Sequence, residues 1–227
     1  MSSTAQAGGA SPVDFAAFGD YGDFRPKKDA PPGARRGEFI RAAYRFQGRI
    51  TADGSSGYPA GPGRYHLYIS WACPWANRAA IVRDLLGLQD VISLSAVDPV
   101  RDGRGWAFRA GDGYGLDPVN GFALLRQAYE ATEPGYDGHV SVPVLWDKLT
   151  GRIVSNNFPD ITLDLDTQFG AWANPGYDLY PQRLRPQIDT VNDLIGCSPR
   201  WTSWKAGWPG SGTCWARPSP RPMCGCM

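Results

Sequence analysis

The sequence predicts an α/β fold, and three observations along the chain predict it. Residues 65–70, YHLYIS, alternate and are rich in strand-forming side chains, and residues 91–97, VISLSAV, read as a second strand. Between them, residues 74–87 repeat apolar side chains at helical spacing and end on a glycine. A hairpin and another helix follow. The order β-α-β and then β-β-α, with a proline in the third strand, is that of a thioredoxin-like domain.

The hairpin lies in the stretch HVSVPVLWDKLTGRIVSN. It predicts strands at Val140–Trp146 and Arg152–Val154, joined by a turn at DKLTG. Pro143 falls inside the first strand. Because proline cannot donate a ladder hydrogen bond, this position indicates either an edge strand or an unusual X-Pro bond.

The helix that completes the domain is predicted from NNFPDITLDLDTQFG. Asn156 or Asn157 would cap its start, and Gly170 would end it. The long connection Asp98–Gly135 is rich in glycine, carries Trp106 and Phe108, and contains a helical pattern in GFALLRQAYEA. Connections of that length are usually functional or mobile.

Four regions are expected along the chain. Residues 1–62 form an irregular extension rich in Gly, Ala, Pro and charge, with four apolar side chains that could dock on a domain: Phe39, Ile40, Tyr44 and Phe46. Residues 63–169 form the thioredoxin-like domain. Residues 170–196 are a linker and the first helix of an all-helical domain, and residues 197–227 have no periodicity.

Composition limits the possible partners. The net charge of +1 gives no extended field for nucleic acid, and no apolar run reaches the roughly 20 residues of a membrane span. The first residues resemble no secretory signal, so the chain is expected to be cytoplasmic. Cysteines 224 and 226 lack the further ligands of a zinc site, and His66 lies in a predicted strand, where a structural role is favoured. No metal is expected.

Cys73 stands where the first strand ends and the first helix begins, before Pro74. A thiolate there would face unpaired backbone N–H groups and the positive end of the helix dipole, which favour the anion. Because the thiolate is the reactive form, the position indicates nucleophilic chemistry, although isolated cysteines are commonly inert core residues. The sequence CPWA lacks a second cysteine, so a resolving thiol would come from another molecule.

The stretches YHLYISWACPWANRAAIVRDLLGL, GWAF and YDGHVSVPVLWDKLTGRIVSN resemble the glutathionyl-hydroquinone reductases, the Xi class of the glutathione transferases, from about Arg64 to Ile195. The resemblance implies that Cys73 attacks the sulfur of a glutathionyl-hydroquinone, a quinone-thiol adduct. It implies Trp106 as a wall of the thiol site and Val142, before a cis Pro143, as a backbone partner of the thiol. Glutathione would be the co-substrate, and the resemblance allows a homodimer.

Two positions depart from the family, which reads SNES where this chain reads SNNF. Asn157 and Phe158 replace the Glu and Ser that hold the charged γ-glutamyl group. Asn carries no negative charge and Phe cannot hydrogen-bond a carboxylate. The hypothesis that follows is a low-molecular-weight thiol with another head group, such as a sugar-linked cysteine of the mycothiol type. It would keep the contacts at Val142 and lose only the charged head-group contacts, with Asn157 as the residue at that part of the thiol site.

The last residues predict a second departure. Read in a shifted frame, Thr213–Met227 permits a sequence that resembles a stretch of transferase C-terminal helical domains, which indicates a frameshift from about Cys197. The tail is then expected to be aberrant and disordered, with most of the helical domain and its substrate tyrosines missing. The alternatives to a hydroquinone reductase are conjugation or dehydroascorbate-type reduction by a related transferase, and an inactive truncated thiol-binding module.

Overall fold

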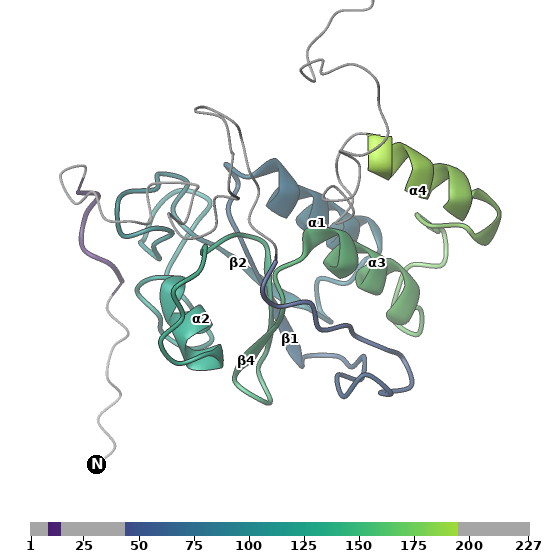
Figure 1. The fold of residues 1–227 in the computed structure, drawn as a ribbon, viewed down its shortest axis with the longest axis horizontal. Helices are drawn as coiled ribbons and strands as arrows, with labels where there is room; N and C mark the ends of the chain where they lie inside the picture. The colour runs from purple at the N-terminus through teal and green to yellow at the C-terminus, as the bar shows by residue number, and fades with distance from the viewer. Residues whose placement is uncertain (1–8, 15–43, 195–227) are drawn as a thin grey trace, which may run out of the picture. The chain divides into compact units, whose positions relative to one another are not determined.

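The computed structural model describes residues 9–14 and 44–194, and Figure 1 shows their elements. Four strands form one mixed sheet in the order β2-β1-β3-β4. They are β1 (Tyr65–Ile69), β2 (Ser93–Ala96), β3 (Val144–Asp147) and β4 (Arg152–Ser155). β1 is parallel to β2 and antiparallel to β3, and β3 pairs with β4 as a hairpin. The predicted thioredoxin-like fold is confirmed.

Three helices cover this sheet: α1 (Pro74–Leu85), α2 (Arg126–Thr132) and α3 (Phe158–Gln168). Figure 1 shows α1 and α3 together on one side of the sheet and α2 on the other. With both faces covered, every residue of β1 is buried. Gly87 follows α1 with φ +68°, a conformation that a glycine adopts without steric cost, so the predicted end of this helix is confirmed.

The hairpin differs from its prediction mainly at the start of its first strand; the far ends of β3 and β4 each lie one residue later than predicted. β3 begins at Val144, and the four residues before it lie outside the strand. The Val142–Pro143 peptide bond is cis, and β3 lies between β1 and β4, so Pro143 marks an unusual peptide bond and not an edge strand. Of the two sequence alternatives for this proline, the structure selects the second.

The helix in the long connection starts later than the sequence pattern indicates. α2 begins at Arg126, because the backbone before it is already paired with another segment. Leu125 N donates to Trp106 O at 2.9 Å, and Phe108 N donates to Ala123 O at 2.9 Å. Those hydrogen bonds fix the connection against the start of the helix.

Parts of the N-terminal region pack against the sheet and helices. Phe46 lies against the rings of Tyr129 and Tyr136, and Tyr44 lies edge-on to Phe158. Ile50 belongs to the core. Docking is therefore confirmed for Tyr44 and Phe46, whereas Phe39 and Ile40 lie outside the described residues.

The chain divides into two units, and the boundary between them in the sequence lies between Arg185 and Pro186. The first unit ends with a 3-10 helix, η1 (Gln182–Leu184), and α4 (Arg185–Leu194) begins at the boundary. A helix thus forms in the region where the sequence predicts one. The expected aberrant tail from 197 to 227 lies outside the described residues. No helix in ranges 9–14 and 44–194 is both long and apolar enough to span a bilayer.

Candidate functional site

Cys73 is the N-cap residue of α1 and follows β1 by a tight turn. Its N–H donates to Ser70 O at 3.0 Å, and its carbonyl accepts from Asn77 N at 3.0 Å. Its side chain makes no capping hydrogen bond and is partly exposed. The thiol Sγ lies 3.7 Å from Val142 O. The only cysteine in the described ranges is thus held at a helix start against the loop that leads into β3.

The loop that carries Val142 is fixed by a buried phenol. Tyr129 OH donates to Ser141 O at 2.8 Å, and Ser141 N donates to the same phenol oxygen at 3.1 Å. Asn156 Nδ2 adds a donor at 3.3 Å. Burial raises the pKa of Tyr129, so its proton is retained and remains available to Ser141. Both backbone groups of the residue before Val142 are therefore satisfied by one side chain.

Trp106 lies in the long connection, with 9% of its surface exposed. Its carbonyl accepts the Leu125 hydrogen bond described above, and the Arg101 guanidinium lies 5.6 Å from the ring centroid. This spacing is that of a cation–π contact. The indole is therefore held on its backbone side and on one ring face.

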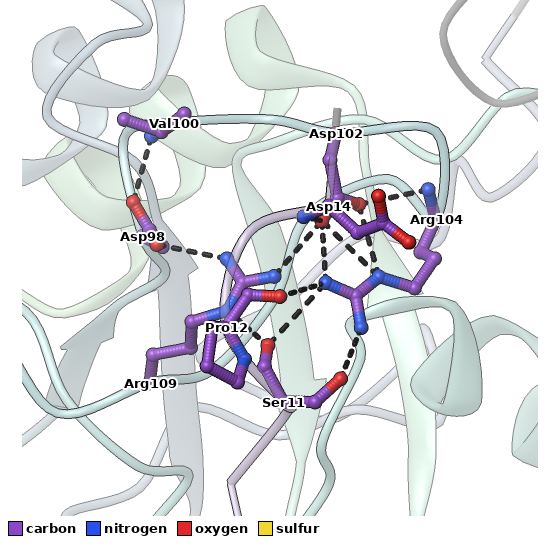
Figure 2. A network of polar contacts seen from close by, with 8 residues as sticks. All are labelled: Ser11, Pro12, Asp14, Asp98, Val100, Asp102, Arg104 and Arg109. Atoms are coloured by element: carbon purple, nitrogen blue, oxygen red, sulfur yellow. Dashed lines mark hydrogen bonds and ion pairs between the residues drawn. The ribbon is translucent and has the colours of Figure 1, made fainter. Parts of the chain in front are cut away.

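The first described residues of the chain are tied to the same connection. Figure 2 shows the contacts, which join two arginines to backbone oxygens of the N-terminal segment. Arg109 Nε donates to Ser11 O at 2.7 Å, and Arg104 Nη2 donates to Pro12 O at 2.7 Å. Ala10 N donates to Phe108 O at 2.9 Å, two residues after Trp106. We call residues 9–14 the N-terminal strap.

Two buried carboxylates complete this network. Arg109 pairs with Asp98 at 2.8 Å and with Asp102 at 3.0 Å (Figure 2). Asp102 also accepts from the Arg104 guanidinium and from Asp14 N at 3.2 Å. Hydrogen bonds from Arg104 hold the pKa of Asp102 well below its usual range. The charge on Asp102 is thus shared by two guanidinium groups and one strap N–H.

Asn157 and Phe158 open α3, and the sequence singles out both. Asn157 has no exposed surface; its Nδ2 donates to Asp160 Oδ2 at 2.7 Å, and its Oδ1 is buried without a hydrogen-bond partner. Phe158 stacks on Trp75 with centroids 5.0 Å apart and has the Arg78 guanidinium 5.6 Å from its ring. An aromatic cluster therefore occupies the start of this helix.

The structure brings only some of the predicted site residues into contact. Cys73 and Val142 meet directly, next to the cis Pro143. Among the hydrogen bonds, ion pairs and ring contacts of the described residues, none joins Trp106 or Asn157 to Cys73. Sequence patterns did not indicate Tyr129, the N-terminal strap or Trp71, which lies two residues before Cys73 with 45% of its surface exposed. Only the aromatic character of Trp71 could have drawn attention to it.

His66 has a structural environment in the sheet. His66 is buried in β1, with Nδ1 2.8 Å from Ser93 Oγ and Nε2 2.8 Å from Ser95 Oγ. The structural role predicted for it is confirmed. Within the part of the chain that the structure describes, no three His, Cys, Asp or Glu side chains gather as a metal site would require.

Known proteins resemble this chain over the region just described. Residues 72–168 match the family model of the glutathione S-transferase N-terminal domain. Glutathionyl-hydroquinone reductase PcpF from Sphingobium chlorophenolicum is 42% identical over 160 residues, which cover 70% of this chain and 50% of the relative. The chain spans about half the length of the curated relatives that it matches.

Solved structures give the same relationship. The Xi glutathione S-transferase from Phanerochaete chrysosporium superposes with a TM-score of 0.66 at 40% identity, covering 70% of this chain and 54% of that one. The glutathione-bound structure of YqjG from Escherichia coli K-12 gives 0.64 at 41% identity, with 66% and 51% covered. Together with the sheet order, these similarities show that residues 72–168 form a glutathione S-transferase N-terminal domain, and that the chain is similar over this region to glutathionyl-hydroquinone reductases and Xi-class glutathione transferases.

Proposed function

We propose that this chain carries the thiol-binding half of a glutathionyl-hydroquinone reductase, with Cys73 as its nucleophile. The observation that supports it most is the placement of the Cys73 thiol at the start of α1, 3.7 Å from the Val142 carbonyl. A thiol ligand that lies along the loop before β3 would bring its sulfur beside that of Cys73. Val142 and Pro143 are the proposed thiol-binding residues on this side, and Trp106 is the proposed wall contributed by the long connection.

The reaction follows from thiolate chemistry. The Cys73 thiolate attacks the glutathionyl sulfur, an S–S bond forms, and the bond between that sulfur and the aromatic carbon breaks. The aromatic carbon keeps the electron pair and takes a proton, which releases the free hydroquinone. Cys73 is thereby oxidised to a mixed disulfide. A second thiol then attacks the glutathionyl sulfur of this disulfide; the two form a new disulfide that departs, and Cys73 leaves as a thiolate.

The start of α3 supports the proposal that the co-substrate can be a thiol other than glutathione, for example a mycothiol-like one. Asn157 offers a neutral, buried amide where the family has a carboxylate, and Phe158 is packed among aromatic rings. Neither side chain can pair with both charges of a γ-glutamyl group. Asn157 Oδ1 lacks a hydrogen-bond partner but is fully buried, so an uncharged ligand donor would reach it only if the start of α3 opens.

The test follows the fate of both halves of the substrate. The reduced chain is mixed with a glutathionyl adduct of a hydroquinone; peptide mass spectrometry follows the Cys73 mixed disulfide, and chromatography follows the released hydroquinone. We expect equal amounts of the two products. Cys73→Ser should give neither, because an alcohol cannot form the mixed disulfide, whereas Cys197→Ser should leave both unchanged. Equal hydroquinone release by Cys73→Ser would refute the assignment.

Other outcomes identify the alternatives. A dehydroascorbate-type reductase would form the Cys73 mixed disulfide while glutathione is oxidised by dehydroascorbate. It would form no mixed disulfide with the hydroquinone adduct. Formation of a thioether from glutathione and an electrophile without any Cys73 adduct would favour a conjugating transferase. Thiol binding without chemistry would indicate a binding module. We also propose that the protein is cytoplasmic and that its partners are small-molecule quinone-thiol adducts. Sedimentation would show whether it forms a homodimer.

A further inference from the structure

Trp71 is a partly exposed aromatic side chain in the turn that positions Cys73. The hydrogen bond from Cys73 N to Ser70 O closes this turn, with Trp71 and Ala72 at its two central positions. Large apolar side chains exposed singly on a surface are common and by themselves indicate nothing. Trp71 differs because its ring is immobilised and because it belongs to the same turn as the proposed nucleophile.

One hydrogen bond restrains the indole ring of this tryptophan, and a second restrains its backbone. Its indole Nε1 donates to Gly113 O at 2.7 Å, and its own carbonyl accepts from Asn77 Nδ2 at 2.9 Å. Gly113 has φ +74°, and Gly115 N donates to Ala96 O at the end of β2. The indole is therefore attached through a tight turn to the edge of the sheet. A ring that is already fixed loses little conformational freedom when a ligand stacks on it.

The sheet order places this ring on a defined side of Cys73. Cys73 follows the end of β1, whose two neighbours in the sheet are β3 and β2. On the β3 side stands Val142, and on the β2 side stands the Gly113–Gly115 turn that holds Trp71. A leaving group that extends from a Val142-bound sulfur toward the β2 side would meet Trp71.

We propose that Trp71 determines specificity for aromatic leaving groups by stacking on the hydroquinone ring while Cys73 attacks the sulfur. The proposal rests on the proposed function and assigns its aromatic substrate half to a residue of this chain. Stacking of two aromatic rings changes binding by roughly three- to tenfold. An effect of that size should appear with aryl adducts and be absent with thiol adducts that carry no ring.

The experiment compares two substrates that give the same product. A glutathionyl naphthohydroquinone and glutathione disulfide both leave glutathione on Cys73, so the rate of Cys73 glutathionylation, measured by peptide mass spectrometry, isolates the leaving group. In the full chain, Trp71→Ala should lower the rate constant with the aryl adduct by roughly three- to tenfold and leave the rate with the disulfide unchanged.

Two further variants test the ring and the position separately. Trp71→Phe keeps an aromatic ring but loses the hydrogen bond to Gly113 O. With the aryl adduct, it should retain more than half of the rate that Trp71→Ala loses. Trp172→Ala removes another tryptophan of similar exposure, 39%, beyond α3, and it should change neither rate. Equal losses with both substrates would show that Trp71 only shapes the turn and would overturn the proposal.

The same data separate this proposal from the proposed function. If the wild type reacts with the aryl adduct and Trp71→Ala reacts equally fast, the role of Trp71 is overturned and the proposed function stands. A wild-type chain that reacts with the disulfide and never with the aryl adduct would overturn both. Thermal unfolding midpoints of the variants should lie near that of the wild type, since the ring is half exposed.

Discussion

At the scale of single residues, His66 shows how burial decides between a chemical and a structural role. Desolvation is the main cause that lowers its pKa to about 4, so the imidazole is neutral near pH 7. Two serine hydroxyls contact its ring nitrogens, and the Tyr68 ring lies 4.5 Å away. Every polar atom of the ring is thus used within the sheet.

His66 should make folding stability depend on pH. Its folded pKa lies below the ordinary 6.5, so between pH 6.5 and 4 the unfolded chain binds more protons than the folded one. Stability from this group is complete above pH 6.5 and is lost as the pH falls toward 4. Between pH 7 and 5 the loss is about 2 kcal/mol, which chemical denaturation at a series of pH values would measure. His66→Gln should flatten that dependence; an equal slope in the variant would assign it to other groups.

At the scale of elements, the start of α3 is where this chain departs most clearly from the family pattern. Asn157 caps the helix by backbone geometry alone, since its side chain bonds to Asp160. Phe158 takes part in ring contacts with Tyr44 and Trp75. The sequence predicted that glutathione would lose its charged partners here, and the structure adds that an aromatic cluster fills the position.

Asn157→Glu with Phe158→Ser should therefore tighten glutathione by about one to two decades for each restored charge contact. The measurement is the glutathione concentration that half-protects Cys73 from iodoacetamide. Because removing Phe158 from its cluster costs about 3–5 kcal/mol, thermal unfolding must show that the double variant is folded. Asn157→Glu alone is the matched control that keeps the cluster.

Asp160 should reduce the gain in glutathione affinity that Asn157→Glu gives. A carboxylate at position 157 would face Asp160 Oδ2, which now accepts from the Asn157 amide at 2.7 Å. Like charges at that distance repel, so the gain should increase when Asp160→Asn is added. Tight glutathione binding by the unmodified chain, indifferent to all three changes, would show that other residues hold the head group.

At the same scale, the sequence predicted the strands and helices better than the segments between them. β1, α1 and α3 follow from periodicity, and α1 also from Pro74 and Gly87, all of which act locally; α3 ends at Gln168, two residues before the predicted stop at Gly170. Pro143 left two readings open because an X-Pro bond takes its isomer from tertiary context. The start of α2 was misplaced because the competing partner of Leu125, the Trp106 carbonyl, lies 19 positions earlier in the chain.

For the candidate site, the same division holds. The position of Cys73 was predictable from the end of a strand and the start of a helix, whereas Val142 followed from the resemblance; the structure adds that the Cys73 thiol lies 3.7 Å from the Val142 carbonyl. Tyr129 and Trp71 were not predictable as site residues, because a sequence does not show whether an aromatic side chain is buried or exposed. Their roles depend on the distant backbone oxygens of Ser141 and Gly113.

At the scale of the whole molecule, the N-terminal strap joins segments about 90 positions apart. Arg104 and Arg109 each donate to strap carbonyls, and both also bind Asp102. The side chain of Asp102 is fully buried. Breaking one partnership of a buried charge is costlier than the pair's net contribution, since the remaining groups stay desolvated. The connection that carries Trp106 should therefore depend on the strap for its order.

Deleting residues 1–14 should loosen that connection. The deletion removes the acceptors at Ser11 and Pro12, the donor at Ala10 and the Asp14 N–H, hydrogen bonds worth about 1 kcal/mol each. Amide hydrogen exchange in the segment 98–109 should then accelerate by at least about tenfold, while the segment 144–155 of the β3-β4 hairpin keeps its protection. Deleting only residues 1–8 is the matched control, because it retains the strap. Unchanged exchange in 98–109 after the longer deletion would show that Asp98 and Asp102 hold the connection without the strap, and glutathione protection of Cys73 should then be unchanged as well.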